Sequence, residues 1–231
     1  MKRLEDLDLN YVLDIGANVG DFSKYIKSIK PECKCFMVEA NPYCEEYLAQ
    51  TNIPYDIAVL SDRRKFANFF IEDNNNIGTG ASLYKENTPY YNRGRRICVT
   101  TKRLDDCNYI KEPIDLIKLD VQGSEVDIIL GGVQTVLRSK YVLIETSLVE
   151  YNINGPQIDS VFNIMSELNF YTNNILEIHR NQLVNNSIFQ IDFLFENMNE
   201  RINNFKFIIL CQKKHQHKKR SVVASEPLLT L

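Results

Sequence analysis

Short apolar runs alternate with stretches of helical periodicity along most of the chain. The apolar runs predict strands, which we place at 11–15, 34–40, 55–60, 114–120 and 141–147. The stretches between and after them carry apolar residues at helical spacing and predict helices at 21–29, 43–50, 124–137 and 157–168. Strands that alternate with helices in this way indicate an α/β fold, with a mostly parallel sheet covered by helices on both faces.

Two parts of the chain depart from this order. The apolar runs at 170–179 and 189–196 follow one another with no helix between them. Such neighbours predict an antiparallel pair that closes one edge of the sheet. Residues 64–101 contain only short apolar runs and an Asn-Gly-rich stretch. We expect short strands and loops there, with a hairpin or a flap over the site as alternatives.

The composition fits one globular domain with a tail. Of the 231 residues 44% are hydrophobic, which is enough for a sizeable core. We expect a single domain over residues 1–211. Residues 212–231 contain a cluster of basic residues without an apolar period and predict a disordered, solvated tail. His215 and His217 lie in this tail and are not expected to be ligands.

Charge and cysteine content narrow the class of protein. The formal net charge of −3 provides no global basic field that would attract nucleic acid. No apolar run is long enough to span a bilayer and no secretion signal is evident, so we expect a cytoplasmic protein without a membrane span. The six cysteines show no metal-type spacing, which favours reduced, structural thiols.

The turn after the first predicted strand is the first candidate site. Ligands of open parallel sheets bind outside the carboxyl ends of the strands, where Asp14, Gly16, Asn18 and Gly20 stand. A dinucleotide loop needs a glycine at the position of Asn18, so this turn suits a ligand without phosphate. Asp14 can receive the ammonium of an amino-acid moiety, and Gly16 lets its carboxylate side pass close to backbone N–H groups.

The next two strands end in residues that extend this site. Glu39 ends the second strand, where a carboxylate can accept both hydroxyls of a ribose. Ala58, in the third strand, is small enough for an adenine ring to lie flat on it, and Asp62 can face the adenine amino group. Two carboxylates without a phosphate cradle point to S-adenosylmethionine. The alternatives are a turn-capping role for Asp14, a surface charge for Glu39 and ordinary strand packing for Ala58.

Acidic residues also follow the fourth and fifth strands. Lys118 and Asp120 share one face of the fourth strand, so Asp120 should reach the mouth of the cleft where the methyl group is delivered. Glu145 ends the fifth strand and either lines the same rim or forms a surface ion pair. Glu125 falls in the first turn of the following helix, where a carboxylate is also favoured as a cap.

In these motifs the chain resembles the FkbM-type methyltransferases. The matching stretches follow the family's order through most of residues 11–197: VLDIGANVGDFS, FMVEANP, IAVLSD, TTKRLDD, IDLIKLDVQGSEVDIILGG, VLIETS and QIDFLFEN. The resemblance implies a Rossmann-like class I methyltransferase fold with a seven-stranded sheet, and O-methylation of a sugar or a small natural product with S-adenosylmethionine. It places Asp14, Gly16, Asn18, Glu39 and Asn41 at the cofactor and Asp120 beside the acceptor.

The predicted reaction is methyl transfer to a hydroxyl of a carbohydrate or small-molecule acceptor. Asp120 is the expected general base, a role that a pKa raised by partial burial would suit. His179 is either a second base or a surface group at a strand end. A divalent cation is not predicted, although Asp120 and Glu145 with water form an alternative magnesium site.

The residues leave three other functions open. A ribose 2′-O-methyltransferase acting on RNA would use Lys118, Asp120 and Glu145, but the acidic body of the protein disfavours nucleic acid. A nicotinamide-dependent oxidoreductase is disfavoured by the missing middle glycine. A non-catalytic cofactor-binding module in a glycan-modifying assembly would have lost the carboxylates of the fourth strand, which this chain keeps.

Overall fold

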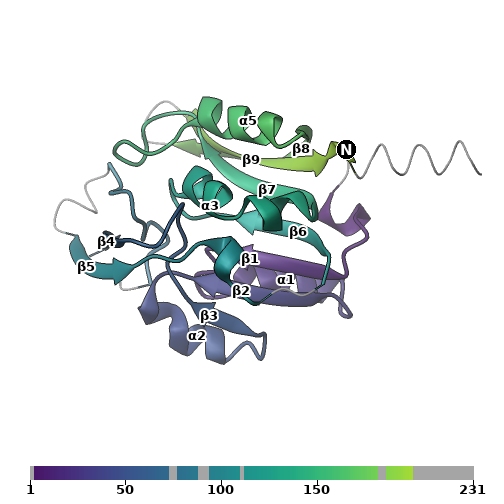
Figure 1. Cartoon of the computed structure of the whole chain (residues 1–231), viewed down its shortest axis with the longest axis horizontal. Coiled ribbons are helices and arrows are strands. Elements are labelled where there is room, and N and C mark those ends of the chain that lie inside the picture. Colours follow the sequence, from purple (N-terminus) through teal and green to yellow (C-terminus); the bar gives the residue numbers. More distant parts are fainter. Residues whose placement is uncertain (1–2, 73–76, 88–93, 110–111, 182–185, 200–231) are drawn as a thin grey trace, which may run out of the picture.

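Seven strands form one mixed sheet at the centre of the protein (Figure 1). The computed structural model describes residues 3–72, 77–87, 94–109, 112–181 and 186–199. The strand order is β3-β2-β1-β6-β7-β9-β8. The strands are β1 (Tyr11–Ile15), β2 (Lys34–Glu39), β3 (Tyr55–Ile57), β6 (Ile114–Leu119), β7 (Ser139–Ser147), β8 (Phe170–Asn181) and β9 (Ser187–Asn197).

The direction of the strands confirms the predicted fold class. β3, β2, β1, β6 and β7 run parallel to one another. β9 is antiparallel to both β7 and β8 and lies between them. The predicted antiparallel pair therefore ends the sheet, and its second strand in the sequence is the inner one. This is the seven-stranded, Rossmann-like arrangement that the resemblance implies.

Helices cover both faces of the sheet, as the alternating pattern predicts. The α-helices are α1 (Asp21–Ile29), α2 (Glu45–Ala49), α3 (Glu125–Gly131), α4 (Val133–Leu137) and α5 (Ile158–Glu167), with short 3₁₀ turns at Leu4–Asp6, Pro42–Cys44 and Leu104–Asp106. Alternate residues of β6 serve the two faces. Leu116 packs with Ile26 of α1, whereas Ile117 and Leu119 pack with α3 and α5.

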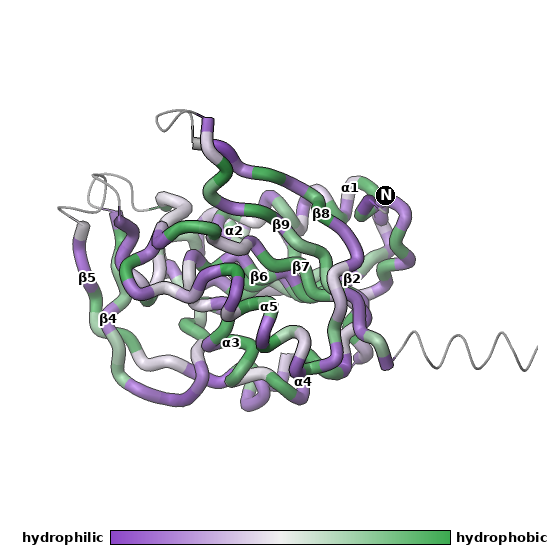
Figure 2. Tube along the Cα trace, turned by 90° about the horizontal axis from the view of Figure 1, so that it is seen from above, coloured by the Kyte–Doolittle hydropathy of each residue, from purple (hydrophilic) through white to green (hydrophobic). Residues whose placement is uncertain are grey.

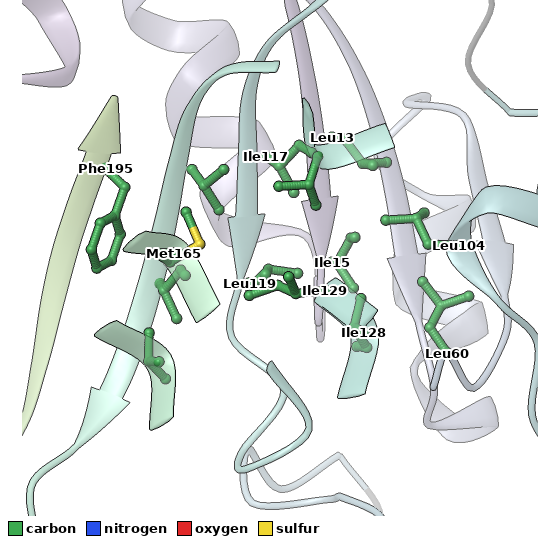
Figure 3. Close-up of a cluster of buried hydrophobic side chains, with 14 of the residues drawn as sticks. Leu13, Ile15, Leu60, Leu104, Ile117, Leu119, Ile128, Ile129, Met165 and Phe195 are labelled. Carbon is green, nitrogen blue, oxygen red and sulfur yellow. The ribbon is translucent and has the colours of Figure 1, made fainter. Parts of the chain in front are cut away.

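The largest apolar cluster lies between the sheet and α3, α4 and α5 (Figure 3). Ile129 of α3 and Met165 of α5 are fully buried against it. The ring of Phe162 meets those of Phe193 and Phe195 edge-on, with centroids 4.9 and 5.3 Å apart. Full burial of one such side chain contributes about 1.5–3 kcal/mol. Figure 2 shows hydrophobic residues along the central strands and hydrophilic residues on many of the connections.

Two predicted elements differ from the structure. The helix expected at 124–137 is interrupted at Gly132, whose backbone leaves the helical region. A β-carbon on Gly131 would lie 2.1 Å from the backbone oxygen of Ser61, so close packing of α3 on the segment after β3 accompanies this break. The third strand pairs with β2 only over Tyr55–Ile57, although the sequence pattern continues to residue 60.

The middle of the chain forms a separate two-stranded sheet. β4 (Phe66–Ile71) pairs with β5 (Arg95–Thr100) in an antiparallel ladder, which confirms the expected short strands, although residues 72–94 separate them and are too many for a tight hairpin turn. This ribbon lies at one side of the main sheet (Figure 1). Phe69 and Ile71 pack with Val59 in a small apolar cluster. Among the described residues no helix is long and apolar enough to cross a membrane. The predicted tail at 212–231 lies outside the described residues.

The backbone of the turn between β1 and α1 lies very close to the backbone at the end of β6. Gly16 has φ +82°, and a β-carbon at this position would lie 1.8 Å from the backbone oxygen of Asp120. Gly20 has the same φ and precedes α1, but a β-carbon there would meet only side-chain atoms, the nearest at 3.1 Å. Gly16 is therefore required both by its backbone conformation and by the space that β6 leaves.

We expect Gly16→Ala to lower the free energy of unfolding more than Gly20→Ala. A left-handed conformation costs a residue with a β-carbon about 1–2 kcal/mol, and this cost applies to both variants. Overpacking against the immobile carbonyl adds about 1–3 kcal/mol at Gly16 only. Urea denaturation of the two variants measures the difference. Equal losses would contradict the proposed contact between the turn and β6.

Candidate active site

A cavity of about 350 Å³ opens at the carboxyl ends of β1, β2, β6 and β7. This volume lies within the range of small-molecule sites, about 300–1,000 Å³. Six of the residues predicted from the sequence line it: Gly16, Asn18, Glu39, Ala58, Asp120 and Glu145. The position at the strand ends is the one that an open parallel sheet offers to a ligand.

Glu39 is fixed in the cavity wall by backbone N–H groups. Its Oε2 accepts a hydrogen bond from the backbone nitrogen of Asn18 at 2.7 Å, and its Oε1 accepts one from that of Asn41 at 2.7 Å. Burial raises the pKa of Glu39, and these backbone donors offset part of that effect. The carboxylate is thus held in one orientation, with its remaining lone pairs available to a ligand.

Asn18 and Asn41 both bind this carboxylate through their backbone nitrogens, but their side chains lie in different places. Asn18 has φ +49° and lines the cavity, and its side-chain amide donates to the backbone oxygen of Ile77 at 3.1 Å. Asn41 is fully buried and does not line the cavity. Its Oδ1 accepts from the backbone nitrogen of Tyr43 at 3.1 Å and caps the 3₁₀ turn that follows β2.

Asp14 lies behind the cavity rather than in its wall. The residue is fully buried, and its Oδ2 accepts a hydrogen bond from Ser23 Oγ at 2.7 Å. Its Oδ1 has no hydrogen-bond partner among the described residues and lies 3.9 Å from Lys118 Nζ. Burial raises the pKa of Asp14, and the Lys118 ammonium opposes this shift. Direct contact between Asp14 and a ligand ammonium stays a prediction. Gly20 likewise does not line the cavity.

Part of the cavity wall on the Glu39 side is apolar, and the backbone nitrogen of Ala58 donates to the backbone oxygen of Glu39 at 2.8 Å. Ala58 lines it together with Leu60, Phe69 and Ile128, so it presents a surface on which a flat ring can lie. Asp62 does not line this cavity and pairs with Lys65 at 2.7 Å. The predicted contact of Asp62 with an adenine amino group therefore has no support from its position.

Asp120 lines the cavity just after β6 and is held by two donors. Lys118 Nζ donates to its Oδ2 at 3.0 Å, and Gln122 Nε2 donates to its Oδ1 at 2.9 Å. Burial raises the pKa of Asp120, but the Lys118 charge and both hydrogen bonds outweigh burial and hold the pKa below its usual value. This is opposite to the raised pKa expected for a general base, because Lys118 shares the face of β6 with Asp120.

Gln122 connects the ends of β6 and β7, a role that the sequence pattern did not reveal. Its backbone has φ +54°, a conformation that costs a non-glycine residue about 1–3 kcal/mol. Its amide nitrogen donates to Asp120 and also to Glu145 Oε2 at 2.6 Å. Gln190 of β9 donates to the same Glu145 oxygen at 2.9 Å. The only signal in the sequence is a polar residue before Gly123 at a strand end.

Glu145 and Glu125 are both buried acids, but they occupy different environments. Burial, followed by repulsion from Asp120 and Asp192, raises the pKa of Glu145 to about 9. Glu125 does not line the cavity, and its Oε1 accepts from the backbone nitrogens of Val121 at 3.2 Å and Gly123 at 3.1 Å. Burial raises the pKa of Glu125 to about 7. The Glu125 carboxylate therefore holds the loop that precedes α3, whereas its role as a helix cap stays a prediction.

His179 lies next to the cavity without lining it. Its Nε2 is 3.8 Å from Glu145 Oε1 and 3.3 Å from Asp192 Oδ1. Asp192 belongs to β9 and was not singled out in the sequence. The strand of His179 thus reaches the acidic end of the site, and its role as a second base stays a prediction.

Comparison with known proteins agrees with this geometry. The sequence model of the methyltransferase FkbM domain matches residues 14–171. The curated 2-O-methyltransferase NoeI of Sinorhizobium fredii is 29% identical over 152 residues, which cover 59% of this chain and 63% of that protein. The match thus spans less than two thirds of the length of this relative.

Solved structures with a similar course of the chain include two methyltransferases. A TehB-like SAM-dependent methyltransferase from Corynebacterium glutamicum has a TM-score of 0.43 and 11% identity, covering 84% of this chain and 85% of that one. A structure of SAM-dependent methyltransferases from Methanosarcina mazei has a TM-score of 0.47 and 8% identity, covering 83% and 93%.

The family match includes the turn after β1, Glu39, Asp120 and Glu145, which form one cavity in the structure. Because it covers more than half of the sequence, the chain belongs to the FkbM methyltransferase domain family.

Proposed function

We propose that this chain transfers the methyl group of S-adenosylmethionine to a hydroxyl of a sugar or glycan. The observation that carries the proposal is the position of Asp120, a carboxylate in the cavity wall between the Glu39 side and Glu145. The name of the relative NoeI, a 2-O-methyltransferase, supports an oxygen acceptor.

The Glu39 side of the cavity fits the cofactor. The Glu39 carboxylate would accept the ribose hydroxyls, and Ala58 with Leu60 would support the adenine ring. Gly16 and Asn18 would border the amino-acid moiety, since both line the cavity at the end of β1. Asp14, Gly20 and Asn41 would act from behind by holding the loops in place. Bound S-adenosylmethionine supplies a methyl group on a positively charged sulfur, which makes the methyl carbon electrophilic.

Asp120 would orient the acceptor hydroxyl and take its proton. As the oxygen forms its new bond to the methyl carbon, the bond from that carbon to sulfur breaks and sulfur keeps the electron pair. The acceptor oxygen then becomes strongly acidic, so a carboxylate with a low pKa can still accept the proton from it. Lys118 and Gln122 fix Asp120 for this role through its two oxygens.

The other side of the cavity has the character of a carbohydrate site. Tyr151 and Phe189 line it and contact each other, with ring centroids 5.4 Å apart. Gln122, Gln190 and Glu145 lie in the same lining and present polar groups. A sugar ring offers an apolar C–H face for the aromatic pair and hydroxyls for the polar groups, so it matches both features of this wall.

We expect Glu39→Gln to weaken binding of S-adenosylhomocysteine about 10- to 100-fold at neutral pH, because charge-assisted hydrogen bonds to the ribose are lost. In the unmodified protein the affinity should fall as the pH is lowered. The fall should begin above the ordinary pKa of 4.5, since the pKa of Glu39 is raised. Isothermal titration calorimetry over a pH series measures both effects.

Glu46→Gln is the matched control for this prediction. Glu46 is an exposed carboxylate of α2 outside the cavity, and its removal should leave the affinity and its pH profile unchanged. If Glu39→Gln kept the full acid-induced loss of affinity, the proposed ribose contact would be refuted.

We expect Asp120→Asn to reduce kcat by about 10²- to 10⁴-fold while binding of S-adenosylhomocysteine persists. The assay follows methyl transfer to nucleotide sugars, free glycans, small natural products and capped RNA. Asp127→Asn removes a carboxylate of α3 that does not line the cavity, and it should keep its activity. Unchanged turnover in Asp120→Asn would exclude the proton-accepting role. Methylation of RNA or of a natural product, with none of carbohydrate, would exclude the sugar acceptor.

A further inference from the structure

We infer that Glu145, His179 and Asp192 form a binding site for one divalent metal ion beside the cavity. The three side chains come from the neighbouring strands β7, β8 and β9, and each offers one ligand atom. These atoms lie within 4.8 Å of one another. The inference concerns metal binding, and only the role of the ion in methyl transfer rests on the proposed function.

The spacing of the three atoms suits a single ion. His179 Nε2 lies 3.8 Å from Glu145 Oε1 and 3.3 Å from Asp192 Oδ1. Two ligand atoms that are each about 2.1 Å from one ion lie between about 3 and 4.2 Å apart. Both distances from the imidazole nitrogen fall within this interval, and the two carboxylate oxygens lie no more than 4.8 Å apart, so an ion needs only a small approach of the side chains.

The charges at this position favour a cation. Glu145 and Asp192 are direct partners in the antiparallel ladder of β7 and β9, where two like charges are destabilising. Their side chains are only 14% and 20% exposed. Within the described parts of the chain, His179 is the only basic side chain with a nitrogen within 4.0 Å of either carboxylate. Lys118 is paired with Asp120 instead.

The surroundings of Glu145 leave one oxygen for the ion. The amides of Gln122 and Gln190 both donate to Oε2, at 2.6 and 2.9 Å, whereas Oε1 points to His179. Such second-layer hydrogen bonds are how proteins orient the carboxylates that bind metals. His179 remains 27% exposed, so water or a substrate oxygen can reach the open positions of the ion.

This site differs from the magnesium site considered in the sequence. The Lys118 ammonium already pairs with Asp120 at 3.0 Å and would repel a second cation at this carboxylate. Two carboxylates and one imidazole suit a first-row ion such as Mn²⁺ or Zn²⁺ better than Mg²⁺. Because Glu145 also lines the cavity, the ion would bind one hydroxyl oxygen of the acceptor and lower the pKa of that hydroxyl. This hydroxyl is either the one that receives the methyl group or its neighbour on the acceptor.

In the test, the full-length, chelator-treated protein is titrated with Mn²⁺, and the electron paramagnetic resonance signal measures the free ion. We expect one Mn²⁺ per chain. Asp192→Asn and His179→Gln should each weaken binding about tenfold or more. Glu177→Gln is the matched control, because Glu177 lies directly opposite Asp192 in the ladder of β8 and β9 but offers no ligand atom to the cluster. Competition with Zn²⁺ tests whether both ions use this position.

Binding of S-adenosylhomocysteine to the same variants shows that they are folded and tests the proposed function separately. Stoichiometric Mn²⁺ binding that falls in Asp192→Asn and His179→Gln but not in Glu177→Gln supports the site. No binding of Mn²⁺ or Zn²⁺, or equal weakening by all three substitutions, would overturn it. Neither result depends on finding the acceptor.

Discussion

The contact between Gly16 and the backbone of Asp120 is the constraint on which the site depends. It brings the turn after β1 against the end of β6, and the backbone nitrogen of Asp120 donates to the oxygen of Ile15 at 3.1 Å. Gly16 in turn donates to the oxygen of Val38 at 2.9 Å, which ties the same turn to β2. The residues around Glu39 and those around Asp120 and Glu145 therefore share one wall of backbone. A small shift in this wall would move both groups of side chains at once.

A row of hydrogen-bonded and ion-paired side chains extends from this wall across the strand ends. Asp14 faces Lys118, Lys118 binds Asp120, and Gln122 joins Asp120 to Glu145, which faces His179. Each member limits the freedom of the next, because most of its hydrogen-bonding capacity is already used. The pKa values of Asp120 and Glu145 move in opposite directions, since the ammonium contacts only the first of these carboxylates. The two acids can therefore serve different purposes in one reaction.

Much of this architecture was predictable, and the reasons for the exceptions are physical. Period-two and helical patterns gave the sheet, its helices on both faces and the antiparallel pair. They also placed Glu39, Asp120 and Glu145 at adjacent strand ends, because parallel strands end at one edge. The break at Gly132, the burial of Asp14 and the bridging role of Gln122 depend on distances between segments far apart in the sequence. Asp192 was missed because its importance comes from its ladder partner Glu145, and pairing across β7 and β9 cannot be read from one strand.

The position of β9 between β7 and β8 has a consequence for how the enzyme is made. The residues on the Glu39 side, from Gly16 to Ala58, come early in the chain and can fold around strands that are already synthesised. Gln190 and Asp192 come from the last described strand, which must pair with β7 before the acidic end of the site exists. Such late, long-range pairing is slow compared with local folding. A nascent chain can thus form the Glu39 side of the cavity on the ribosome well before its acidic end is complete.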